Sequence, residues 1–269
     1  MNITKDYSLA HLSMIEVPPI GLVRAAQQAG FNYTGFRLTP TSSGIDHGIL
    51  GNGVAIRELK SVIADSGVGV LDVEVIRIKE DGPTADPMPL FEAAEYLGAR
   101  YVITTLEDPD PVRRVESLAL LAAQAAEYQL ALSVEFMLFS AAPTLQMACE
   151  SVLATGASNV VVLADVLHLV RSGGAPDDML DYPARLFPYV QICGAEGSSA
   201  APDAAAARVE AVKARLMPDQ GELPVREFTE CIPTGAILAV ECPLVGLGNP
   251  ADPAALAVDL LAAARRASA

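Results

Sequence analysis

Four oxygen-bearing side chains lie at or near the ends of otherwise apolar segments in the second half of the chain. They are Glu135 in "LALSVEF" (130–136), Asp165 in "NVVVLAD" (159–165), Gln191 in "YVQIC" (189–193) and Glu241 in "ILAVEC" (237–242). A buried carboxylate without a partner is costly, and three that converge repel one another. A divalent cation removes both penalties, and three carboxylates with one amide oxygen suit Mg²⁺ or Mn²⁺ better than zinc. The pattern therefore predicts a metal site, although a single acid at a strand end is more often solvated or salt-bridged.

Few basic side chains are available to neutralise these acids. Within and directly after the predicted strands, the cationic residues are Arg37, near the end of the second strand, and Arg77, directly after the third. This scarcity favours a metal ion over ion pairs as the partner of the carboxylates.

Eight β-rich apolar segments alternate with helical segments rich in alanine and leucine. The predicted strands cover residues 7–12, 33–38, 68–76, 101–106, 130–136, 159–165, 189–193 and 237–242. This alternation is typical of an α/β fold, a single (β/α)₈ TIM barrel, whose active site lies at the carboxyl ends of the strands. The alternative, a doubly wound open sheet, normally has a glycine-rich turn after its first strand, and residues 11–19 contain no glycine. No shift in composition marks a boundary, so we expect one barrel domain over residues 1–269.

Composition excludes several classes of function. The chain has 269 residues, 51% of them hydrophobic, and a formal net charge of -15, which repels nucleic acid and anionic membrane surfaces. No apolar run reaches the roughly 18–20 residues of a membrane span, and the beginning of the chain does not resemble a signal peptide. We therefore expect a cytoplasmic protein with no nucleic-acid or membrane partner. The four scattered cysteines are predicted to be reduced and mostly buried.

The chain resembles the xylose isomerase-like TIM barrel superfamily over nearly its whole length. This superfamily includes sugar phosphate isomerases, ketose 3-epimerases, hydroxypyruvate isomerase, inosose dehydratase, 3-dehydroshikimate dehydratase and the apurinic endonucleases. The resemblance is carried by "VEFM" (134–137), "LADVLHLVRSGG" (163–174), "YVQIC" (189–193), "MPDQGELP" (217–224) and "AVECP" (239–243). It implies that Glu135, Asp165, Gln191 and Glu241 hold one catalytic divalent metal, Mn²⁺ or Mg²⁺, with Co²⁺ as a further option.

The residue at position 191 indicates which members of the superfamily the chain resembles most. Epimerases and endonucleases usually carry histidine at this position, whereas hydroxypyruvate isomerase-like and some dehydroshikimate dehydratase-like members carry glutamine. The chain has only three histidines, which argues against the multi-metal endonucleases. One departure is Gly194, at a position where relatives often have an aspartate. We expect this glycine to remove a hydrogen-bond partner from the site.

The resemblance also implies the reaction. Glu135 and Glu241 would lie on opposite sides of a small α-hydroxycarbonyl substrate, a keto-sugar or a hydroxy-keto acid, and exchange protons with its carbons through an enediolate. Return of the proton to the neighbouring carbon is isomerisation, and return to the other face is epimerisation. Loss of a β-hydroxyl from the same intermediate is dehydration, so a lyase acting on an inosose or a cyclic keto acid such as 3-dehydroshikimate is the alternative. A barrel that binds sugar without turnover is a third hypothesis. Relatives form dimers or tetramers, so a homodimer or homotetramer is expected.

Four further residues are predicted to bind the substrate. His168 follows Asp165 in a D-x-x-H pair and could instead cap the next helix. Arg171 precedes a serine and two glycines and could bind a carboxylate, or it could be a surface arginine. Glu74 could reach the mouth of the barrel, at the carboxyl ends of its strands, or pair with Arg77 or Arg37. His11 lies in the first predicted strand and could reach the mouth from there.

Two long loops complete the prediction. Residues 39–53 follow the second strand and could form a lid over the mouth. Residues 194–207, a low-complexity segment after the seventh strand, are expected to form an exposed loop.

Overall fold

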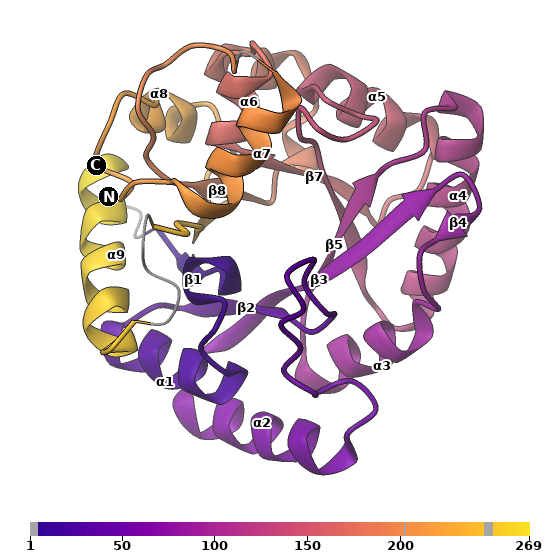
Figure 1. The fold of residues 1–269 in the computed structure, drawn as a ribbon. Helices are drawn as coiled ribbons and strands as arrows, with labels where there is room; N and C mark the ends of the chain where they lie inside the picture. Colours follow the sequence, from indigo (N-terminus) through magenta and orange to yellow (C-terminus); the bar gives the residue numbers. More distant parts are fainter. Residues whose placement is uncertain (1–4, 202, 245–249) are drawn as a thin grey trace.

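Eight parallel strands close into a ring in the computed structural model of the protein, which describes residues 5–201, 203–244 and 250–269 (Figure 1). The strands of the ring are β1 (Tyr7–Leu9), β2 (Tyr33–Arg37), β3 (Gly69–Lys79), β5 (Tyr101–Leu106), β6 (Ala131–Glu135), β7 (Val160–Asp165), β8 (Tyr189–Ile192) and β9 (Ile237–Val240). Each pairs with the next, and β1 pairs with both β2 and β9. This closure confirms the barrel and excludes the open sheet.

Helices surround the ring and follow its strands in the chain, and the last of them comes after the final strand (Figure 1). They are α1 (Pro19–Ala29), α2 (Gly53–Ser66), α3 (Met88–Leu97), α4 (Pro111–Glu127), α5 (Leu145–Ala154), α6 (Val166–Arg171), α7 (Ala204–Lys213), α8 (Val225–Glu230) and α9 (Pro253–Ala267). Local sequence sets several of their ends. Asp110 and Asp252 accept hydrogen bonds from the first backbone N–H groups of α4 and α9, and each is followed by a proline in the first turn.

The barrel strands are apolar on both faces because two cores cover them. The larger core fills the space between the sheet and the helices, and the smaller one lies inside the ring. The inner core consists of Leu71, Val75, Ile103, Leu163, Tyr189, Ile237 and Ala239. Residues two positions further along β5, β7 and β9 point to the same interior because side chains alternate along a strand. The polar strand ends therefore lie above a packed apolar floor.

The predicted strands match the observed ones, with shifts at their ends. β1 ends at Leu9, and His11–Met14 form a 3₁₀ helix instead of continuing the strand. β3 runs on to Lys79 and pairs with the short antiparallel strand β4 (Gly82–Pro83).

The structure also tests the predictions for the loop over residues 194–207 and for the four cysteines. Residues 194–207 do not form one exposed loop, because Gly194 and Ala195 pair with the chain near Leu216 and Gly221, and α7 begins at Ala204. The four cysteines are unpaired as expected, and three of them are buried. Within the described ranges, no helix combines the length and the hydropathy that a membrane crossing requires.

Candidate functional site at the carboxyl ends of the strands

The structure brings Glu135, Asp165, Gln191 and Glu241 together at one end of the barrel. Asp165 and Gln191 are partners in the register of β7 and β8, and the Gln191 Nε2 donates to Glu241 Oε1 at 2.8 Å. Ligand atoms of Glu135, Asp165 and His168 all lie within 4.8 Å of one another. All four predicted ligands therefore converge, as parallel strands that end at one rim require.

Asp165 has a local structural role as well. Its Oδ1 accepts hydrogen bonds from the backbone N–H of Leu167 at 2.7 Å and of His168 at 3.3 Å, which caps α6. The carboxylate thus ends the strand and begins the helix. Because Oδ1 of Asp165 is held by this cap, Oδ2 remains for another partner. The sequence analysis identified no cation that could pair with it.

The structure supplies that cation from Arg215, which sequence reasoning missed. Its Nη1 donates to Asp165 Oδ2 at 2.5 Å, and its Nη2 lies 2.8 Å from Glu241 Oε2. The Nε donates to the carbonyl oxygen of Ala211, and the side chain is 1% exposed. Because Arg215 follows α7 and belongs to no strand, a search for basic residues on the strands could not find it.

Gly194 allows Arg215 to reach the site. Its backbone exchanges hydrogen bonds with Leu216, at 3.0 Å and 2.8 Å. A Cβ at position 194 would lie 2.2 Å from the carbonyl oxygens of both Met217 and Gln220. The glycine therefore permits the close approach that places residue 215 beside β8. A side chain such as the aspartate that the resemblance implied at position 194 has no room here, because the backbone of Met217 and Gln220 occupies the space.

The charges of the cluster do not balance. Three inward carboxylates face one guanidinium, so two negative charges are uncompensated when every group is ionised. Burial, together with the nearby charges of Glu241 and Asp165, raises the pKa of Glu135 well above its usual value. Burial likewise raises the pKa of Glu241 to about 8, although the charge of Arg215 opposes this. For Asp165, burial is outweighed by the positive charge of Arg215, and the pKa is lowered.

His168 lies within this cluster as a neutral ring. Its Nε2 is 3.8 Å from Glu135 Oε1, and burial lowers its pKa to about 4. The edge of the ring packs against Phe139, with ring centroids 5.8 Å apart. The backbone of His168 belongs to the first turn of α6, but its side chain points to Glu135. It is therefore placed to donate a hydrogen bond to a ligand at the mouth.

The donor set fits a divalent cation. The Oε1 atom of Gln191 is buried and has no hydrogen-bond partner within the described part of the chain, and such orphaned acceptors are rare unless a ligand completes them. Among the residues that the structure describes, the one polar side-chain contact of Glu135 is the 3.8 Å distance from its Oε1 to His168 Nε2. Asp165 and Glu241 each give one oxygen to Arg215, and a carboxylate has lone pairs to spare. A charge of +2 at this place would match the two uncompensated negative charges.

Arg171 has no N–H group left for a substrate, which corrects the prediction that it binds one. All five of its N–H groups are used. Nε and Nη2 donate to the Glu210 carboxylate at 2.6 Å and 2.8 Å, and the other bonds go to the carbonyl oxygens of Glu196, Gly197 and Ser199. Arg171 therefore fastens α7 and the preceding loop to α6.

His11 is also committed to the backbone, contrary to its predicted role. Its Nε2 bonds to the carbonyl oxygen of Val17 at 2.8 Å, and its Nδ1 accepts from the Arg37 N–H at 2.9 Å. Burial lowers its pKa to about 3. Its ring stacks on His47, in the loop over residues 39–53, with centroids 4.8 Å apart. This contact connects the predicted lid to the barrel.

The Oε2 of Glu74 lies 3.1 Å from the Nη1 of Arg37, so the predicted ion pair with Arg37 is present. Arg77 pairs instead with Glu107, through its Nε at 3.2 Å. Glu74 is thus buried at the mouth, with its charge already balanced.

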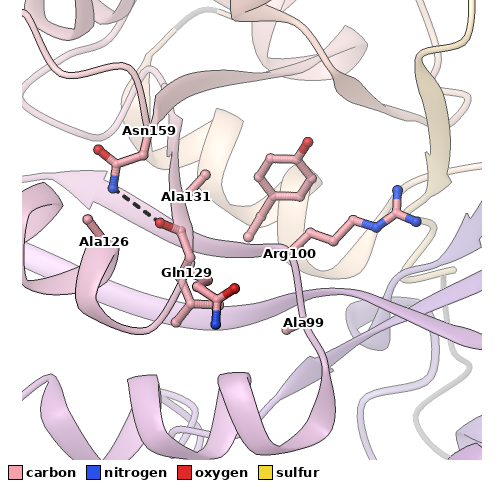
Figure 2. A pocket seen from close by; sticks show the side chains of 8 residues that line it. Ala99, Arg100, Ala126, Gln129, Ala131 and Asn159 are labelled. Atoms are coloured by element: carbon pink, nitrogen blue, oxygen red, sulfur yellow. Dashed lines mark hydrogen bonds between the residues drawn. The ribbon is translucent and has the colours of Figure 1, made fainter.

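A hollow at the opposite end of the barrel lacks comparable groups. It lies where β5, β6 and β7 begin, and Figure 2 shows Arg100, Gln129 and Asn159 around it. The Nδ2 atom of Asn159 donates to the carbonyl oxygen of Leu130 at 3.1 Å. Among the described residues that line the hollow, none has a carboxylate, imidazole or thiol side chain. Among the described residues, this hollow therefore offers no side chain suited to acid–base catalysis or to binding a metal.

Comparisons with known proteins agree with this architecture. No family model matches the chain, and no curated protein matches it. A xylose isomerase-like TIM barrel/4-hydroxyphenylpyruvate dioxygenase fusion protein is similar to 97% of the chain, with 22% identity and a TM-score of 0.78, and the match covers 42% of the fusion protein's length.

Two further solved structures match along nearly their whole length. The structure of the IolI protein with a binding zinc atom has 12% identity and a TM-score of 0.77, over 98% of both chains. The probable 3-DHS dehydratase AsbF of Bacillus anthracis has 13% identity and a TM-score of 0.69, over 95% of this chain and 97% of that one. The fold of this chain is therefore that of the xylose isomerase-like TIM barrels.

Proposed function

We propose that this protein is an enzyme that uses one divalent metal ion to isomerise or epimerise a small α-hydroxycarbonyl compound. The observation that carries the proposal is the convergence of three carboxylates at the mouth of the barrel with the Oε1 of Gln191, which has no hydrogen-bond partner among the described residues. Arg215 neutralises one of the three negative charges and leaves two for the ion.

The metal would be held by Glu135, Asp165, Gln191 and Glu241. Oxygen donors of this kind favour Mn²⁺ or Mg²⁺, and the zinc atom in the IolI structure supports a divalent ion in this fold. When bound, such an ion polarises adjacent carbonyl and hydroxyl oxygens and makes the proton on the intervening carbon more acidic. Arg215 would orient Asp165 and Glu241 through the oxygens that it holds.

Glu135 and Glu241 are the proposed acid–base pair. They stand on β6 and just after β9, on either side of Asp165 and Gln191, so a substrate between them would meet one carboxylate on each face. Burial makes both carboxyl groups hold a proton more tightly than an exposed acid does, which suits a group that must take up a proton and return it. His168 would donate a hydrogen bond to a substrate oxygen next to Glu135.

A dehydratase acting on a cyclic keto acid is the second candidate. Gln191, in place of a histidine, and the similarity in fold to the probable 3-DHS dehydratase both support it. The same residues would remove the same proton, and the outcome would then depend on whether a hydroxyl group stands β to the carbonyl group.

Elemental analysis tests the metal site first. Purified wild type should contain close to one divalent ion per chain, and Asp165→Ala should lose it. Glu222→Ala removes an exposed carboxylate and serves as the matched control. A wild type that stays empty after incubation with excess Mn²⁺ would sink the proposal.

Turnover then separates the two reactions. Incubation of α-hydroxyketones in D₂O should place deuterium on the carbon skeleton if the protein is an isomerase or epimerase. A dehydratase acting on 3-dehydroshikimate should instead produce a strongly absorbing conjugated product. Glu135→Gln and Glu241→Gln should each lose activity by about a hundredfold or more, as expected when an acid–base group is removed.

A further inference from the structure

The ring of His168 is held differently from the rings of the other two histidines. His11 is fixed by hydrogen bonds at both ring nitrogens, at 2.8 Å and 2.9 Å, and His47 Nε2 bonds to a backbone carbonyl oxygen at 3.0 Å. Neither ring nitrogen of the buried His168 has a hydrogen-bond partner within the described part of the chain, because Glu135 Oε1 lies 3.8 Å from Nε2. The cap at Asp165 fixes the backbone of His168 and leaves its ring free to turn, so the orientation of the ring depends on packing.

The aromatic partner of the His168 ring is Phe139. The two ring centroids are 5.8 Å apart, and the ring planes make an angle of 76°, which is an edge-to-face arrangement. Aromatic rings prefer this geometry because the positive edge of one ring meets the negative face of the other. A turned imidazole would lose the contact. The contact therefore favours the orientation in which Nε2 faces Glu135.

A tight turn after β6 presents Phe139 at this place. The Ser140 N–H donates to the carbonyl oxygen of Met137 at 2.8 Å, and the Ser140 hydroxyl group donates to the same oxygen at 2.9 Å. Just beyond the turn, the Ala141 N–H donates to the carbonyl oxygen of Leu106 at 2.9 Å, which attaches the segment to the end of β5. Phe139 therefore projects from a turn that is hydrogen-bonded internally and to the barrel.

Arg208 on α7 contacts the same phenyl ring. Its guanidinium carbon lies 5.7 Å from the Phe139 ring centroid, within the about 6 Å over which a cation attracts the face of an aromatic ring. α7 is itself fastened by the pair of Arg171 Nε with Glu210 Oε2 at 2.6 Å. Phe139 thus contacts both α7 and the His168 ring, and these contacts limit its movement.

We propose that Phe139 is a positioning residue of the candidate site, whose ring holds the His168 imidazole with Nε2 turned toward Glu135. Packing against an aromatic ring here replaces the hydrogen bond at the second ring nitrogen that commonly orients a functional histidine. This inference rests on the proposed function, because it serves the role of His168 as a donor to a substrate oxygen. Phe139 itself exchanges no proton and supplies no metal ligand. Its loss should therefore lower turnover and leave the metal content unchanged.

Nuclear magnetic resonance of the histidine rings tests the orientation without a substrate. The chain has three histidines, so isotope labelling gives three ring signals, and His168→Gln identifies one of them. In protein loaded with diamagnetic Mg²⁺, the ring carbons of His168 should relax as a rigid group. In Phe139→Leu, which keeps an apolar side chain and removes the ring, they should relax as a mobile group. Tyr96→Leu removes a ring that is 45% exposed on α3 and, as the matched control, should change nothing.

Turnover separates positioning from a general structural role. With the α-hydroxyketone or cyclic keto acid that wild type converts, Phe139→Leu should lower kcat by about tenfold and change KM by less than about twofold. Phe139→Tyr keeps the ring and should restore most of the wild-type kcat. Arg208→Gln removes the cation above the ring and should lower kcat by about two- to fivefold. Arg24→Gln, at an exposed position on α1, removes the same charge and should leave kcat unchanged.

Other results would overturn the proposal. These are a His168 ring as rigid in Phe139→Leu as in wild type, loss of the bound metal in that variant, or a kcat that Phe139→Tyr fails to restore. A wild type that converts no tested substrate, but whose His168 ring becomes mobile in Phe139→Leu, would retain the positioning contact and reject the proposed enzyme. The two failures are therefore distinguishable.

Discussion

The Nη1 of Arg215 lies 2.5 Å from Oδ2 of Asp165, and the two residues are 50 positions apart in the chain. The same guanidinium reaches Glu241, so one buried cation joins the acids of β7 and β9. Removing it would leave three buried carboxylates with no positive charge between them.

Arg215→Gln should therefore destabilise the metal-free protein at neutral pH. Loss of one partner of a buried ion pair costs about 3–5 kcal/mol of the free energy of unfolding. Urea unfolding after treatment with a chelator measures this. Arg266→Gln is the matched control, because Arg266 pairs with Asp219 at 2.7 Å with its side chain 63% exposed, and should cost less than about 1 kcal/mol. Equal losses in the two variants would contradict the prediction.

Gly194→Ala should displace the segment that carries Arg215. The added Cβ would meet two backbone carbonyl oxygens at 2.2 Å, and backbone cannot move aside as a flexible side chain can. We expect a loss of about 1–3 kcal/mol in the free energy of unfolding, as for other overpacked positions. Gly53→Ala, whose Cβ would meet only the end of the Arg57 side chain, should change it by less than about 0.5 kcal/mol. Similar stability of the two variants would show that residues 194 and 217–220 do not pack as described.

Arg171→Gln should loosen α7 without touching the substrate directly. Glu210→Gln removes the partner of the same ion pair and should have a similar effect, and the double variant should cost less than the sum of the two. Hydrogen exchange should rise in residues 195–213 in both variants. A rise in KM after Arg171→Gln with no change in hydrogen exchange would instead indicate that Arg171 binds the substrate.

The buried ring of His11 makes stability depend on pH. Its pKa falls to about 3 in the folded protein, mainly through burial, from 6.5 for a free histidine. Between these values the unfolded chain binds more protons, so the free energy of unfolding decreases as the pH falls through this window. His11→Gln should be less stable than wild type near neutral pH, because the ring bonds to Val17 and Arg37 are lost, but its stability should decline less on acidification. Denaturant curves at several pH values would show this, and parallel declines would refute it.

The sequence was informative where the signal is local. Strands covered on both faces read as continuous apolar runs, so the odd carboxylate at the end of each run identified Glu135, Asp165 and Glu241. The convergence of these residues then followed from the rule that parallel strands end at one rim.

Contacts between distant segments could not be read in this way. Arg215 follows Gln191 by 24 positions and reaches the site only because Gly194 permits a close backbone approach. Arg171 and His11 carried suitable chemistry, but their partners, the Glu210 carboxylate and the Val17 carbonyl oxygen, are fixed by tertiary packing. Gly194, at a position where the resemblance implied an acid, was the signal in the sequence that pointed to this rearrangement.

The buried guanidinium also bears on how the protein would be made. Many metal sites assemble only as the chain folds around the ion, because the bare carboxylates would otherwise drive the chain apart. Here the chain supplies its own counter-ion, because Arg215 pairs with both Asp165 and Glu241. In the proposed enzyme, folding and metal loading would therefore be separate events, and the ion acquired would depend on what the cell supplies to the folded barrel.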